Sequence, residues 1–77
     1  MTKLNKMNPG ESGRVVVVDG DTPVTRRLIE LGLVPGRAVK HLRNAPMQDP
    51  MEIQVGSSCI SLRHAEASLV AVEVEHD

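Results

Sequence analysis

The sequence predicts a mainly β domain, a small barrel or sandwich of about five short strands with one inserted helix and a short helical turn. Short runs of β-branched or alternating apolar residues recur along the chain, and turn residues such as glycine, proline and asparagine separate them. The segment 23–36 instead combines a helix start, an apolar face and a helix stop. With 77 residues, the chain is expected to form a single domain over residues 1–77.

The helix is predicted by signals at both of its ends. Thr22 or Asp21 can cap the first turn, and Pro23 suits the first helical position, where its missing N–H costs nothing. Gly32 can take the left-handed conformation that ends a helix, so that Leu33 folds back in a Schellman cap. The sequence therefore predicts one well-capped helix between the first two strands.

The spacing of apolar residues predicts which face of this helix is buried. Val24, Leu28 and Leu31 recur at i, i+4 and i+7, so they are expected to form one stripe on the core. Arg26 and Glu30 lie on the far side at i, i+4, where an ion pair contributes roughly 0.2–0.5 kcal/mol. The outer face is thus expected to be charged and to border a groove between the helix and the barrel.

The strands are predicted from β-branched runs and from alternation of apolar and polar residues. They are expected at residues 14–18, 37–43, 51–55, 58–62 and 70–74. Gly56-Ser57 separates the third and fourth of these segments, a spacing that is typical of a β-hairpin. Residues 63–67 leave room for about one helical turn before the last strand.

Composition and charge exclude several classes of partner. The chain has no Phe, Tyr or Trp, and both base-stacking platforms and grooves for proline-rich peptides depend on aromatic side chains. A net charge of −1 gives no field that favours nucleic acid or anionic membranes. The longest apolar run is four valines, and the N-terminus lacks a secretory signal, so a cytoplasmic location is expected.

The sequence carries no recognisable catalytic constellation, and no enzymatic activity is expected. Cys59, His41 and His64 supply parts of a nucleophilic site, but no strained turn presents them, and Cys59 is interpreted as a structural thiol. His64 and Glu66 stand at i, i+2, which suits neither one helix face nor a zinc-finger spacing, and a terminal His76-Asp77 would bind metals only adventitiously. No cofactor and no metal site are predicted, although weak Fe²⁺ or Zn²⁺ binding stays open.

Three motifs occur in an order and spacing that resemble one protein family. They are RRLIELGLVPG at 26–36, APMQDP at 45–50 and LRHAEA at 62–67, and they resemble the ferrous-iron transport protein A (FeoA) family over roughly residues 4–75. The resemblance implies an SH3-like small β-barrel with an inserted helix and no enzymatic activity. It also implies a cytosolic accessory of the ferrous-iron permease FeoB, a membrane protein with a cytosolic G domain. A similar domain closes some iron-dependent transcriptional repressors, but no DNA-binding helix-turn-helix precedes it here.

Two residues depart from the pattern of the family. Gln48 stands where the family often has glycine, so the conformation of its loop is expected to differ. His41 stands where an apolar strand residue is common, so this wall of the barrel, or its surroundings, is expected to be altered.

The leading hypothesis is a binding module that regulates the FeoB permease and its G domain, with no nucleic-acid partner and with the membrane reached only through that partner. The predicted contacts lie on the capped helix and on the loop that follows the second strand: Arg26, Arg27, Glu30, Leu33, Pro46, Met47 and Asp49. A rigid helix and a proline-stiffened loop lose little entropy on binding. Met47 near the loop tip is expected to tuck into the end of the barrel.

Two alternatives stay open beside this hypothesis. One is a ferrous-iron or transition-metal sensor or carrier, which needs His41, Cys59, His64 or Glu66 to converge in space. The other is homo-oligomerisation through a free sheet edge, since an unpaired edge is a template for another strand.

Overall fold

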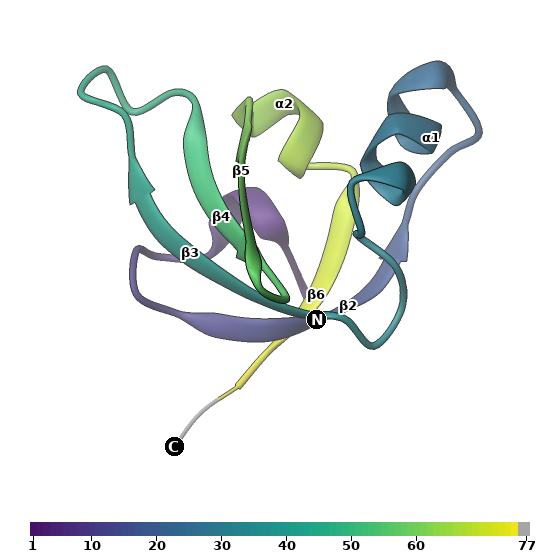
Figure 1. Ribbon diagram of the computed structural model, residues 1–77, viewed down its shortest axis with the longest axis horizontal. Helices are drawn as coiled ribbons and strands as arrows, with labels where there is room; N and C mark the ends of the chain where they lie inside the picture. Colours follow the sequence, from purple (N-terminus) through teal and green to yellow (C-terminus); the bar gives the residue numbers. More distant parts are fainter. Residues whose placement is uncertain (76–77) are drawn as a thin grey trace.

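Within residues 1–75, six antiparallel strands form one strongly curved sheet in the order β1-β6-β2-β3-β4-β5 (Figure 1). The elements are β1 (Thr2–Lys3), the 3₁₀ helix η1 (Leu4–Lys6), β2 (Ser12–Val18), α1 (Pro23–Glu30), β3 (Ala38–Asn44), β4 (Met51–Val55), β5 (Ser58–Leu62), α2 (His64–Ala67) and β6 (Val70–Val74). This computed structural model describes residues 1–75, so the tail His76-Asp77 considered above as a metal-binding segment lies outside the described residues. The predicted mainly β class, with one helix between the first two long strands, is confirmed.

The structure has one strand more than expected. β1 is only two residues long, and it pairs with β6 through Thr2 opposite Val72 and Lys3 opposite Ala71. Two residues are too few to show an alternation, so the sequence pattern could not reveal this strand. No helix within residues 1–75 is long and apolar enough to cross a membrane.

The hydrophobic core is built from aliphatic side chains and methionine. It gathers side chains from both ends of the chain and from every strand except the short β1, and its fully buried members are Leu4, Leu28, Leu33, Met51, Ile53, Leu62, Ala67, Val70 and Val72. The alternation predicted for 51–55 is confirmed, because Met51, Ile53 and Val55 face the core. Gly56 has a φ of 59°, and the two-residue turn that it opens places Val55 opposite Ser58.

Both caps of α1 form as predicted. The Thr22 hydroxyl accepts a hydrogen bond from the Thr25 N–H at 3.2 Å, which satisfies one of the free donors of the first turn. At the other end Gly32 has a φ of 105°, and the Leu33 N–H donates to the Leu28 carbonyl at 3.2 Å, the long bond of a Schellman motif. Leu33 is thereby turned back into the core.

The predicted apolar stripe of α1 is wrong at two of its three positions. Leu28 is buried, but Val24 is 39% exposed and Leu31 is 36% exposed. The helix has only eight residues and meets β2 along a narrow line, so the residues on either side of Leu28 face solvent. Thr25 is buried in their place, and its hydroxyl donates to the Asp19 carbonyl at 2.9 Å.

Candidate partner-binding surface

Three segments lie together at one end of the molecule: α1, α2 and the β3–β4 loop of residues 45–50 (Figure 1). We call these three segments the helical end. In Figure 1 α2 stands between the loop and α1, and side-chain contacts of α2 reach both. The two regions that the sequence predicted as separate contact sites therefore form parts of one surface.

An ion pair joins α1 to α2. The Arg27 guanidinium binds the Glu66 carboxylate, and the other oxygen of Glu66 accepts the Arg63 N–H at 2.9 Å, which satisfies a free donor at the start of α2. Arg27 therefore holds the two helices together, a role that sequence reasoning missed because its partner is 39 positions away. The expected pairing of Arg26 with Glu30 is wrong: the carboxylate beside Arg26 belongs to Asp21, at 3.4 Å.

Asp49 joins the loop to α2. Its Oδ1 accepts the backbone N–H of His64 at 2.9 Å, so the side chain caps a free donor in the first turn of α2. Its other oxygen lies 3.7 Å from the Arg63 guanidinium. The His64 Nε2–H donates in turn to the Gln48 carbonyl. Asp49, which was predicted to contact a partner, has a structural role within the helical end.

A buried histidine of β3 connects the core to the β3–β4 loop through side-chain hydrogen bonds. His41 is 1% exposed; its Nδ1–H donates to the Met7 carbonyl at 2.8 Å, and its Nε2 lies 3.0 Å from the Asn44 Oδ1. The Asn44 amide then donates to the Gln48 side chain at 3.1 Å. The polar residue in the barrel wall thus has a polar atom beside each ring nitrogen, and it connects the core to the loop.

The tip of the loop projects into solvent. Met47 is 87% exposed, so the expectation that it tucks into the barrel end is wrong. The reason is the tight base of the loop, where the Gln48 N–H donates to Ala45 at 2.7 Å and the Ala45 N–H donates to Pro50 at 2.9 Å. Gln48 takes the left-handed φ of 71° that glycine favours. These bonds leave the apolar side chain of Met47 free for a partner.

Leu33 is a second correction among the predicted contact residues. Its exposure is 0%, because the Schellman cap turns it into the core beside Leu28. A partner cannot touch it without unfolding the end of α1. By contrast Arg26, Glu30 and Pro46 are exposed, as expected for contact residues.

A groove of about 370 Å³ separates the start of α1 from α2. Its lining comes from the turn before α1, from α1 itself and from the α2 region: Asp19, Gly20, Thr22, Val24, Thr25, Ala65, Glu66 and Leu69. The groove was expected between the helix and the barrel, whereas it lies between the two helices. Ala65 lies in the helical turn predicted at 63–67 and Leu69 lies just beyond it, and no sequence pattern linked them to the start of α1.

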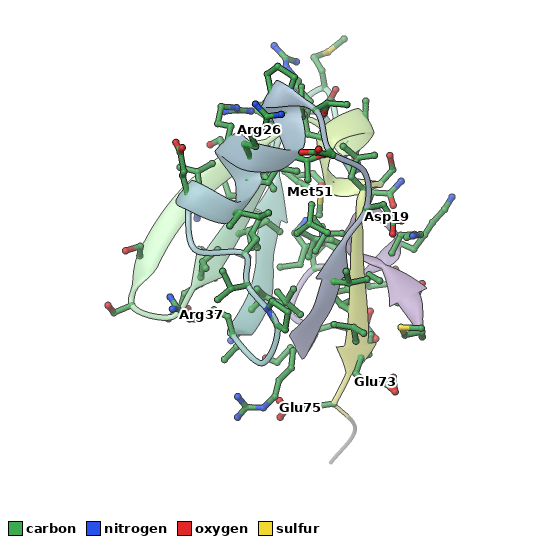
Figure 2. All side chains as sticks on the ribbon, turned by 90° about the vertical axis from the view of Figure 1, so that its right-hand side faces the viewer. Asp19, Arg26, Arg37, Met51, Glu73 and Glu75 are labelled. Atoms are coloured by element: carbon green, nitrogen blue, oxygen red, sulfur yellow. The ribbon has the colours of Figure 1, made fainter. Side chains whose placement is uncertain are left out.

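Exposed apolar side chains concentrate on this surface. Of the six large hydrophobic residues that are exposed within residues 1–75, four belong to α1, its cap or the loop: Val24, Ile29, Leu31 and Met47. The exposed Arg26 lies on α1 as well, and Figure 2 shows it in the upper part of the molecule. Exposed apolar residues with charged residues among them are typical of a protein-binding surface.

A model of the FeoA domain family matches residues 2–74 of the chain. The chain belongs to the FeoA domain family. The Fe(2+) transport protein A/Fe(2+) transporter FeoB fusion protein of Porphyromonas gingivalis is 28% identical over 72 residues, which are 94% of this chain and 8% of that relative. The chain thus spans a small fraction of the length of this curated relative.

Two solved structures of FeoA proteins share the fold. The FeoA protein from Chlorobium tepidum is 36% identical, with a TM-score of 0.87 over 95% of this chain and 70% of that chain. FeoA from Stenotrophomonas maltophilia, solved with zinc and described as a prokaryotic SH3 domain protein, is 31% identical, with a TM-score of 0.84 over 95% of this chain and 91% of that chain. The predicted SH3-like architecture is confirmed.

Proposed function

We propose that this FeoA-family chain is a cytosolic, non-enzymatic accessory of bacterial ferrous-iron uptake that binds and regulates a FeoB-type permease. The observation that carries the proposal is the Porphyromonas gingivalis relative, in which an FeoA part and an FeoB transporter form one polypeptide. Fusion keeps two parts at high effective concentration. Without fusion, the association of the two parts depends on a docking surface.

The helical end is the surface that we assign to this contact. It presents Ile29 and Met47 as exposed apolar side chains, together with the exposed Arg26. Hydrogen bonds hold both segments in place before binding, so little conformational entropy is lost when a partner immobilises them. The partner is the cytosolic G domain of the permease, and the membrane is reached only through it.

Binding of the purified chain to that G domain, in GDP and GTP-analogue states, tests the proposal. The variant Arg26→Glu/Met47→Asp changes two exposed residues of the helical end, and we expect it to weaken binding at least about tenfold, as for loss of an interface hot spot. Arg14→Glu is the matched control, because Arg14 is a similarly exposed arginine paired with a carboxylate, Glu75. Figure 2 shows Glu75 at the opposite end of the molecule from Arg26.

Equal binding by the double variant and the wild type would remove the helical end as the contact. Absence of wild-type binding to the G domain in either nucleotide state would remove the proposed partner. Because the Stenotrophomonas maltophilia structure contains zinc, the same series includes an anaerobic titration of the chain with Fe²⁺ or Zn²⁺ alone, which tests the alternative of a metal sensor or carrier. Within residues 1–75 no group of three or more His, Cys, Asp or Glu side chains is placed to hold a metal ion. Saturable binding of either metal at micromolar concentration would nevertheless favour a metal sensor or carrier over a permease accessory.

A further inference from the structure

The two edges of the sheet differ in how well they are protected. β1 is a two-residue strand, and its Lys3 binds Asp19 at 2.6 Å. β5 is a regular five-residue strand with an unbroken register to β4, and its sequence, Ser-Cys-Ile-Ser-Leu, has no charged residue and no proline. Short length, lysine, proline and bulges are the usual devices that stop an edge from pairing with another chain. β1 has two of these devices, and β5 has none.

The register shows which backbone groups of β5 are free. Val55 and Ser58 close the two-residue turn and so form a hydrogen-bonded pair, and such pairs recur at every second residue. The Gly56 N–H donates to Ala38 on the opposite side at 3.0 Å, which fits this phase. The N–H and C=O groups of Cys59 and Ser61 therefore point away from β4. Both residues are exposed.

We propose that β5 pairs antiparallel with β5 of a second copy of this chain, about a two-fold axis at Ile60. Cys59 of each copy then lies opposite Ser61 of the other, and these two positions exchange about four backbone hydrogen bonds. A second copy fits because an antiparallel partner must supply free donors and acceptors at the same two-residue spacing, which β5 itself does. This inference is independent of the proposed function.

The charges beside β5 are compatible with this pairing. On the neighbouring strands Arg43 and Glu52 bind each other at 2.7 Å, so the strip next to the edge is locally neutral. The hydrogen bond from Arg43 lowers the pKa of Glu52, which keeps the pair charged at neutral pH. Glu52 stands opposite Ser61 within the chain. In the proposed pairing no negatively charged residue of the second copy faces Glu52 across the two-fold axis. The strip beside β5 therefore adds no local like-charge contact to the approach of two copies.

A concentration series tests the proposal, using analytical ultracentrifugation and amide NMR from micromolar to millimolar chain. We expect dimers to form with concentration and amide shifts to centre on residues 58–62. Ser61→Lys places a charge on the paired edge and should raise the dimer dissociation constant at least about tenfold. Gln54→Lys adds the same charge on β4, one strand away from the paired edge, and should change the dimer dissociation constant by less than about threefold. A wild type that stays monomeric at millimolar concentration, or equal effects of the two variants, would overturn the proposal.

Oxidative cross-linking tests the position of the axis. In the proposed register Ser61→Cys puts two cysteines directly opposite each other, about 5.5 Å apart between Cα atoms, which a disulfide can span. In the wild type Cys59 and its copy are diagonal and beyond that reach. We expect disulfide-linked dimers of Ser61→Cys, and none of the wild type or of the control Ser58→Cys. Rapid cross-linking of the wild type would move the axis to Cys59 and contradict the register.

Discussion

The end of α1 and the 45–50 loop both carry motifs of the FeoA family, yet the fold uses them in opposite ways. The first turns its apolar residue inward, since Leu33 is 0% exposed. The second turns its apolar residue outward, since Met47 is 87% exposed. Local hydrogen bonds fix both segments. The comparison teaches that a recognisable motif can mark a cap that stabilises the core or a tip that stays available for a partner, and only burial distinguishes the two.

The largest expected effect is on the inward side of this comparison. Leu33→Ala removes a fully buried side chain, so the free energy of unfolding should fall by about 2–5 kcal/mol. Leu31 lies two positions earlier and is partly exposed, so Leu31→Ala should lower the free energy of unfolding by less than about 1 kcal/mol. Urea denaturation of both variants measures the difference. Equal losses would mean that Leu31 contributes to the core as much as Leu33 does, and would contradict the difference in their burial.

The glycine between these two leucines is the next test. Gly32→Ala places a Cβ at a φ of 105°, with Val55 Cγ1 and the Arg37 guanidinium each 3.3 Å away. The left-handed conformation alone costs a non-glycine residue about 1–2 kcal/mol. We expect at least this loss of unfolding free energy in thermal or urea denaturation. A variant as stable as the wild type would contradict the Schellman cap.

Asp49 distinguishes a structural loop residue from a contact residue. Asp49→Ala removes the acceptor of the His64 N–H, and loss of such a cap costs about 1 kcal/mol. Asp49→Asn keeps an oxygen at the same place and should recover most of that stability. Both should bind the permease G domain like the wild type once folded. Wild-type stability of Asp49→Ala combined with weak binding would return Asp49 to the contact set.

The smallest expected effect is on the outward side. Gln48 holds a φ of 71° that glycine adopts without strain, so Gln48→Gly should relieve strain. Glycine loses more entropy on folding, and the bond from Asn44 disappears, so the net gain should be only about 0.5 kcal/mol. Denaturation midpoints measure this gain, and Ala45→Gly serves as the control for adding a glycine to the loop. A clear loss of stability would show that the side-chain bond outweighs the strain.

The parts of the fold that were predictable depend on neighbours in sequence. Thr22 and Gly32 cap α1 through bonds that span only a few residues, and the Gly56 turn closes its own hairpin. The side of α1 that meets the sheet was not predictable, because it depends on where β2 lies. The Arg27–Glu66 pair joins two elements that are far apart in sequence, and no local pattern announces it.

The candidate site was predicted in part for the same reason. Arg26 and Pro46 are exposed, as expected, because nothing in their segments requires burial. Met47 was placed in the barrel end on its apolar character alone, whereas the backbone bonds of Ala45 and Gln48 decide its direction. Asp49 looked like a surface charge until α2 supplied the N–H that it caps.

The most direct test of the helical end as the permease contact is an amide NMR titration of the labelled chain with the G domain, in GDP and GTP-analogue states, beside an Fe²⁺-only control. We expect shifts to cluster on α1, on residues 45–50 and on the residues that line the groove, including Ala65 and Leu69. The β4 and β5 amides should move only with chain concentration. Shifts confined to the sheet, or present only with Fe²⁺, would contradict the assignment of the helical end as the partner-binding surface.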